Sequence, residues 1–181
     1  PGAADLVIIA DSAVGPEIEE QNVSIVDSFV TFTAASMGVD DRNDDLFLDN
    51  PKMQTFLIGN RWRYDNRDGQ EGQFGFQSTF NNVDAGTIDD RAVVNPWKAN
   101  HDVNRHEVWL KRGMVFKDNP GSSLGFMASG TYHDLKSNYG NRQYNGIQKM
   151  LYANLLYSTD LKSDNHKIIT GASFQGEQYE E

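Results

Sequence analysis

The sequence predicts an all-β protein, an antiparallel up-and-down meander that forms part of a transmembrane β-barrel. Three observations favour this fold. Apolar and polar residues alternate over stretches of about ten residues, the length of a tilted membrane-crossing strand. Long polar segments separate these stretches at one end and short turns at the other, as in outer-membrane barrels. The polar positions are mostly Gly, Ser, Gln, Asn and Thr, which suit a crowded aqueous interior.

About nine strands are expected, and their close spacing makes consecutive strands antiparallel neighbours. Alternation is clearest from the middle of the chain onward, where Phe74, Phe76 and Phe80 share one face of a strand. The predicted strands are Asp5–Val14, Glu17–Val26, Ser28–Met37, Thr55–Tyr64, Gln73–Phe80, His106–Phe116, Leu124–Tyr132, Met150–Ser158 and Ile168–Phe174. Aromatic residues near strand ends suit the two membrane interfaces.

The connections are expected to be long at the outer end and short at the inner end. The long polar segments are Asp40–Met53, Asn81–Arg105 and Asp134–Asn145. The short turns are Asp65–Gln70, Lys117–Ser122 and Thr159–Asn165. From this asymmetry we expect the functional residues to lie in the long loops and in the polar interior.

Two polar residues fall on the predicted apolar face. Arg112 shares its face with Val108 and Leu110, and Asn60 shares its face with Phe56. An arginine at the bilayer midplane costs about 2–4 kcal/mol, and less near the interface. A register-shifting bulge, an Arg112 that snorkels to the interface, or a face outside lipid would each account for this residue.

Composition narrows the class of protein. The 181 residues form one domain, 1–181, with 26 acidic against 16 basic side chains, which argues against nucleic acid as a partner. Cysteine is absent, so no thiolate metal site or disulfide framework is expected. The longest apolar run, Leu6–Ala10, is too short for a helical membrane span. The start, Pro1–Asp5, lacks signal-peptide character, so a mature or excised piece is expected.

Six segments, in this order and spacing, carry a family resemblance: Asp41–Pro51, Gly59–Tyr64, Gly72–Gly75, Tyr139–Tyr144, Tyr152–Tyr157 and His166–Phe174. They resemble the early barrel strands of TonB-dependent outer-membrane receptors of Bacteroidota-type bacteria, over roughly residues 28–181. The resemblance implies a barrel of about 22 strands around an N-terminal plug. The chain supplies neither the plug nor the TonB-contacting motif, so a receptor fragment in the cell outer membrane is expected.

One segment has the spacing of a cation-binding loop. Oxygen donors recur at every second position, as in an EF-hand loop, with Phe47 contributing its backbone carbonyl. The candidate ligands are Asp41, Asn43, Asp45, Phe47 and Asp49, with Asp84, Asp89 and Asp90 from the next long loop. Leu46 stands where a sharp turn prefers glycine, and Lys52 stands where a bidentate glutamate would close the cage. The alternatives are structural calcium and an acidic, solvated loop.

Four loop residues are candidate contacts for a flat or ring-bearing nutrient, through stacking and cation–π attraction: Trp97, Tyr139, Arg142 and Tyr144. Rigidifying the loops is the alternative role. A histidine–tyrosine pair such as His133 with Tyr132 would suit haem iron, although scattered histidines are more often ordinary loop residues. No nucleophile elbow, phosphate-binding loop or zinc-protease motif is present, and an enzyme is not expected.

The predicted function is import of a scarce chelated nutrient. Within the resembled family, calcium-ordered acidic loops are a feature of cobalamin receptors, so cobalamin is the first substrate and an iron-siderophore or haem the next. The implied partners are outer-membrane lipid and TonB through the missing plug, and a surface lipoprotein is left open. Two alternatives remain: a soluble β-sandwich or lipocalin-like ligand-binding module, and a small structural outer-membrane barrel.

Overall fold

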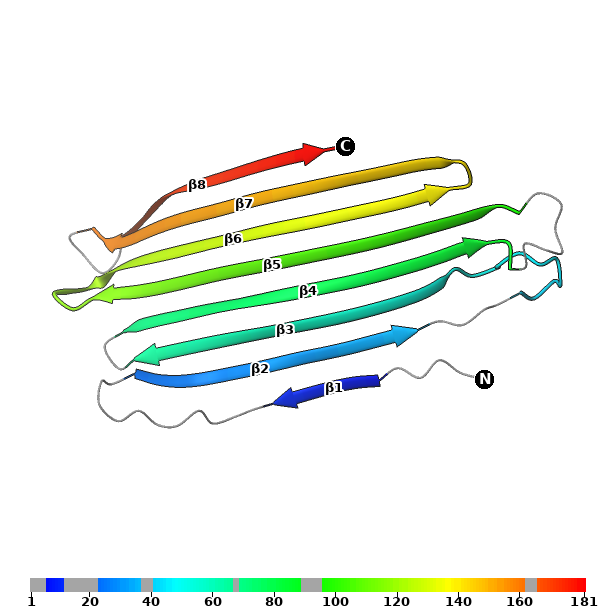
Figure 1. The fold of residues 1–181 in the computed structure, drawn as a ribbon. Coiled ribbons are helices and arrows are strands. Elements are labelled where there is room, and N and C mark those ends of the chain that lie inside the picture. The colour runs from blue at the N-terminus through cyan, green and yellow to red at the C-terminus, as the bar shows by residue number, and fades with distance from the viewer. Residues whose placement is uncertain (1–5, 12–22, 37–40, 67–68, 89–95, 162–165) are drawn as a thin grey trace.

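The chain forms one antiparallel sheet whose spatial order follows its sequence order (Figure 1). The computed structural model describes every residue except 1–5, 12–22, 37–40, 67–68, 89–95 and 162–165. The strands are β1 Leu6–Asp11, β2 Val23–Ser36, β3 Lys52–Asn66, β4 Gln70–Gly86, β5 Lys98–Phe116, β6 Asn119–Tyr139, β7 Arg142–Asp160 and β8 Lys167–Glu180. The predicted all-β, antiparallel meander is confirmed.

Strand pairing keeps one register over most of the sheet. Residues of β5 pair with β6 from Ala99 opposite Tyr139 to Val115 opposite Ser123 without a slip. A slip of one residue would turn every apolar side chain to the other face, so the apolar pattern specifies the register. The alternation of the sequence therefore carries through the sheet.

Most strands are longer than predicted, and the third long segment is not a loop. β4 continues to Gly86, and β5 begins at Lys98, inside the segment expected to be the second long loop. The segment Asp134–Asn145 consists of the ends of β6 and β7 joined by a tight turn at Gly140 and Asn141. Gly140 takes a φ of 57°, a conformation open to glycine without strain. The prediction of a third long loop was wrong because polar residues dominate this segment, so the apolar stripe that marked the predicted strands ends before it.

The first part of the chain also differs from the prediction. The expected strands Glu17–Val26 and Ser28–Met37 correspond, where residues are described, to the single strand β2. A register shift between Ile25 and Asp27 interrupts its pairing with β3. The prediction placed a strand break where the structure has an irregularity within one continuous strand.

The sheet is a single layer. Each strand contacts only its neighbours in sequence, so no second sheet or helix covers either face among the described residues. Among the side chains described from residue 41 onward, Ala99 is the one buried hydrophobic residue, and large apolar side chains such as Val108 and Phe174 are each 58% exposed. A soluble domain buries its apolar face against another layer. This sheet leaves that face uncovered.

Candidate functional site

One face of the sheet carries a continuous band of apolar side chains, the apolar belt. Residues paired across antiparallel strands lie on the same face, so the register identifies its members. They are Phe56, Ile58, Trp62, Tyr64, Phe74, Phe76, Phe80, Val108, Leu110, Met114, Leu124, Phe126, Tyr132, Leu151, Leu155, Tyr157, Ile168 and Phe174. The belt covers about nine residues of a strand, close to the length of a tilted transmembrane strand.

Aromatic rings pack against one another along the belt. The Trp62 and Phe74 rings stack with centroids 4.7 Å apart, and those of Phe56 and Phe80 lie 6.0 Å apart. Such cross-strand pairs contribute about 0.2–1 kcal/mol each. The belt is therefore ordered by lateral contacts within the layer, without a layer above it.

Arg112 lies on the belt face but near its edge at the short turns. It pairs with Gly72 and Phe126, and the register shift of β5 comes later, between Val115 and Phe116. Its Nη2 donates to Gln70 Oε1 at 3.1 Å, which directs the guanidinium toward the turn. A bulge therefore does not remove Arg112 from this face, which leaves two alternatives: an arginine that snorkels, or a face outside lipid.

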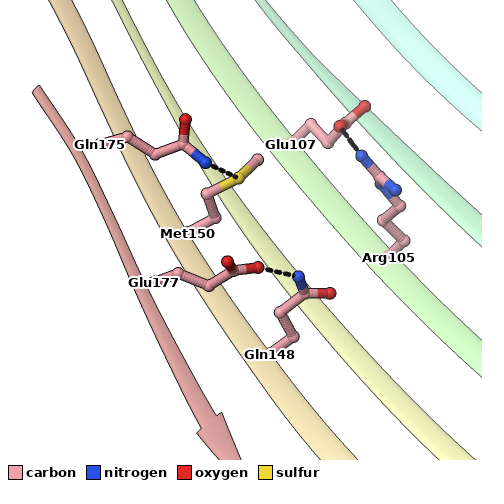
Figure 2. Close-up of polar contacts among 6 residues, drawn as sticks. All are labelled: Arg105, Glu107, Gln148, Met150, Gln175 and Glu177. Atoms are coloured by element: carbon pink, nitrogen blue, oxygen red, sulfur yellow. Dashed lines mark hydrogen bonds and ion pairs between the residues drawn. The ribbon is translucent and has the colours of Figure 1, made fainter. Parts of the chain in front are cut away.

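The opposite face is polar. Some of its side-chain hydrogen bonds link β7 with β8, and others join residues of a single strand, as within β5 (Figure 2). Gln148 donates to the Glu177 carboxylate and, at 2.9 Å, to the Tyr179 hydroxyl. Arg105 pairs with Glu107 two residues along β5. Because these groups are bonded to one another, the polar face presents a preformed hydrogen-bonding surface.

A hollow of about 460 Å³ lies near the short turns. Most of its lining comes from the polar face and includes Arg61, Arg63, Glu71, Lys111 and Asn154. Three cations against one carboxylate in this set give the hollow a positive balance, which favours an anionic or polar occupant.

At the other end of the sheet, two long connections are bonded to each other. Phe47 and Thr87 form an isolated β-bridge, and the Leu48 amide donates to the Gly86 carbonyl at 2.9 Å. The rings of Phe47 and Trp97 stack, with centroids 6.0 Å apart and planes 19° apart. We call this end of the sheet, with the described parts of its two connections (41–51, 87–88 and 96–97), the outer rim. These parts of the two connections pack against each other.

The structure brings the four predicted ligand contacts to the outer rim. Tyr139 and Arg142 are paired across β6 and β7, and Tyr144 lies two residues further along the same polar face. Trp97 lies beside the tight turn, because a Cβ at Gly140 would come within 3.0 Å of its ring. Two of the four flank the turn itself, where the sequence predicted a long loop.

His101 joins this group, although the sequence pointed to it only as a loop residue. Its ring meets Tyr139 edge-on at 4.8 Å between centroids, and its Nδ1 lies 3.0 Å from Ser137 Oγ. Extending the period-two count backward along β5 would have found it. Tyr132 and His133 are adjacent residues of β6 and therefore face opposite sides of the sheet, so they do not form the pair that would suit haem iron.

Tyr144 is further held by a carboxylate. Its hydroxyl donates to Glu181 Oε1 at 3.2 Å. The negative charge of Glu181 and this hydrogen bond raise the pKa of Tyr144 above its ordinary value, because both disfavour the phenolate. Tyr144 therefore stays a neutral hydrogen-bonding group across the physiological range.

The predicted cation loop is wrapped around its own backbone amides. The Leu46 amide donates to Asp41 Oδ2 at 3.1 Å, and the Phe47 amide to Asp45 Oδ1 at 2.8 Å. Asn43 Oδ1 accepts from the Asp45 amide at 3.3 Å, and Asp49 Oδ2 from the Arg42 amide at 2.6 Å. The alternating oxygens thus close the loop into a compact turn.

Leu46 takes a φ of 63°, the left-handed conformation for which an EF-hand loop uses glycine. The sharp turn therefore forms despite the side chain. Asp84 lies within β4, not in a loop, and accepts from Asn100 Nδ2 at 2.6 Å. Asp89 and Asp90 lie outside the described residues. Among described residues, no three His, Cys, Asp or Glu side chains gather as metal ligands.

Comparison with known proteins gives no relative. No family model, no curated protein and no solved structure matches the chain. In the part of the chain that the structure describes, no helix is long and apolar enough to span a membrane.

Proposed function

We propose that this chain is part of the barrel of a TonB-dependent receptor in the cell outer membrane. Its role is import of a scarce chelated nutrient, with cobalamin as the first candidate and an iron-siderophore or haem as the next. The apolar belt faces lipid, the polar face lines the lumen, and the outer rim meets the nutrient. A plug outside this chain contacts TonB, and energy transmitted through it releases the nutrient inward.

The exposed, unlayered apolar belt is the observation that carries this proposal. Val108, Leu110 and Leu155 are 58%, 44% and 44% exposed, although each belongs to a long aligned strand with complete lateral pairing. Water disfavours such a surface by about 25 cal/mol per Å². Acyl chains can cover it while the polar face stays wet, which is the arrangement of a transmembrane barrel.

The protruding strands support an outer-membrane orientation. Beyond the belt, β4, β5 and β6 continue with polar residues on the belt face, such as Asn82, Asp102 and Lys136, which are paired in one row. This part of the belt face therefore suits water and not acyl chains. The longer connections lie at this end, so we assign it to the cell exterior.

The outer rim supports recognition of a ring-bearing nutrient. The rim carries three exposed aromatic residues, Trp97, Tyr139 and Tyr144, which are 44%, 45% and 48% exposed. The Arg142 guanidinium lies on the same rim. Their exposure leaves ring faces free for stacking, and the guanidinium suits anionic groups of a chelate. Structural calcium bound by the Asp41–Asp49 loop would order the rim through the Phe47 stack.

A nitroxide scan of β5 in the full-length protein, reconstituted into liposomes, tests the membrane assignment. Spin labels are attached to cysteines that replace, one at a time, Val108, Trp109, Leu110 and Lys111. The exposure of these labels to the two relaxation agents should alternate along the strand. We expect high exposure to oxygen and low exposure to a water-soluble nickel chelate at Val108 and Leu110. The reverse is expected at Trp109 and Lys111, because those residues face the lumen.

The same scan separates the alternatives. In a soluble sandwich, labels at Val108 and Leu110 would be shielded from both relaxation agents by a second protein layer. High nickel-chelate exposure on both faces would equally contradict the proposal. Lys167, on the polar face of β8, provides a control position that should remain water-exposed.

A further inference from the structure

On the belt face, near the short turns, a small cluster of residues surrounds the guanidinium of Arg112. Tyr64, Gly72 and Arg112 are paired in line across β3, β4 and β5. The Arg112 Cζ lies 6.0 Å from the centroid of the Tyr64 ring, within the range of a cation–π interaction. Gln70, one row nearer the turn, accepts from Arg112 Nη2 at 3.1 Å. We call Arg112, Tyr64 and Gln70 the arginine cluster.

Gly72 makes room for this cluster. A Cβ on Gly72 would lie 1.9 Å from Tyr64 Cε1, so the phenol ring occupies the space that the missing side chain leaves. The ring thereby extends across β4 toward Arg112. An alanine at position 72 would displace the ring, because 1.9 Å is far inside van der Waals contact.

Arg112 retains capacity for a further anionic partner. A guanidinium carries five N–H donors in a planar fork, and the contact with Gln70 uses one of them. Arg112 is exposed, and among the described residues no carboxylate forms an ion pair with it. Because Gln70 accepts through a neutral amide, it does not compensate the positive charge of Arg112. The site therefore favours an anion with several acceptor oxygens.

Apolar side chains adjoin the cluster, both across the strands in the row of Arg112 and along β5 toward the middle of the belt. Phe126 pairs with Arg112 and is 37% exposed, and Leu155 pairs with Phe126 in the next strand. Leu110 lies two residues from Arg112 on the same face. A ligand seated here would meet a cation at the interface edge and an apolar surface beyond it. That order of polarity is the order within a phospholipid.

We propose that the arginine cluster binds the phosphate of a membrane phospholipid whose acyl chains lie along Phe126, Leu110 and Leu155. Two guanidinium N–H groups would donate to phosphate oxygens, while Tyr64 and Gln70 hold the guanidinium at the interface. The bound lipid fixes the depth of this part of the sheet in the bilayer. This inference rests on the proposed membrane orientation of the belt.

The test compares lipids with and without phosphate on the purified full-length protein in detergent. Native mass spectrometry measures the fraction of protein that carries a short-chain phosphatidylglycerol or a matched diacylglycerol. We expect about tenfold tighter binding of phosphatidylglycerol, since hydrogen bonds to charged groups contribute about one power of ten or more. Arg112→Gln should remove this preference, and Arg112→Lys should reduce it.

The matched control is Arg105→Gln, which removes an arginine from the same strand but from its polar face. It should leave the tenfold preference unchanged. An unchanged preference in Arg112→Gln, or an equal loss in Arg105→Gln, would overturn the proposal. Competition by inorganic phosphate at the same concentration would also overturn it, because a free anion would then suffice.

The nitroxide pattern of β5, measured on the Arg112→Gln protein, separates the two proposals. Retained oxygen exposure at Leu110 shows that the variant folds and that the belt still faces lipid, so a lost lipid preference then supports the phosphate site. If the wild-type protein shows the pattern but no lipid preference, the phosphate site fails and the membrane orientation stands.

Discussion

At the residue scale, Gly75 shows how the sheet accommodates a large aromatic side chain on its polar face. A Cβ at Gly75 would lie 2.5 Å from Trp109 Cζ2 and 2.8 Å from the backbone oxygen of Asn60. Trp109 pairs directly with Gly75 across β4 and β5, so its ring covers the bare backbone. The glycine is therefore a packing requirement of the indole.

Gly75→Ala should lower the free energy of unfolding by about 1–3 kcal/mol, the usual cost of overpacking. Both neighbours would have to move, and the Asn60 carbonyl belongs to the backbone of β3. The midpoint of urea-induced unfolding of the full-length protein in detergent measures this change.

Gly125→Ala is the matched control on the same face. The nearest atom to a Cβ there is the Leu156 oxygen at 4.0 Å, so the added methyl group meets open space. This variant should be neutral or up to about 1 kcal/mol more stable, because alanine loses less backbone entropy. Equal destabilisation by both alanines would contradict the packing argument.

At the element scale, alternation located the strands but not their full length. The predicted segment Gln73–Phe80 covers the part of β4 that crosses the apolar belt, whereas the strand runs from Gln70 to Gly86. Beyond Phe80 the belt face of β4 continues with Asn82 and Asp84, so the apolar stripe that marked the strand ends there. Hydrogen bonds to the neighbouring strands hold this part of β4 extended. The alternation pattern of a single strand contains no information about these bonds.

The acidic loop makes a second prediction at this scale. Calcium should protect the Asp41–Asp49 loop from limited proteolysis, because alternating oxygens bind a hard cation. Asp41→Ala combined with Asp45→Ala should abolish the calcium-dependent protection. It should also loosen the loop without calcium, since both carboxylates accept backbone amides.

The paired variant Asp41→Asn with Asp45→Asn separates charge from loop closure. Asparagine keeps an oxygen that accepts the Leu46 and Phe47 amides, so protection without calcium should persist while the calcium response disappears. A calcium response that survives in both double variants would end the calcium hypothesis.

At the scale of the whole molecule, the sheet has two edges and an apolar face that no other described element covers. β1 and β8 each pair with one strand among the described residues. Unpaired edges and uncovered apolar surface both promote association in water. Lipid, further strands and a polar lumen together would satisfy all of these surfaces.

We therefore expect the full-length protein to need detergent. Size-exclusion chromatography should give a monodisperse, β-rich species in detergent and aggregates after the detergent is removed, because the apolar belt is then exposed to water. Folded, monodisperse protein in plain buffer would contradict the membrane proposal and favour a soluble ligand-binding module.

The sequence by itself determined the secondary-structure class, the meander order and the identity of the apolar face. A period of two, repeated between turn signals, is enough for these features because side chains alternate along any strand. It predicted Trp97, Tyr139, Arg142 and Tyr144 as loop residues, whereas the last three lie at the ends of β6 and β7. The tight turn at Gly140 and the partnership of His101 with Tyr139 were missed.

Only the tertiary structure decided which segments meet and what remains uncovered. The bridge between Phe47 and Thr87, the row from Tyr64 to Arg112 and the single-layer exposure of the belt all depend on register across strands. Register is a relation between distant parts of the chain, and the local pattern of any one strand does not contain it.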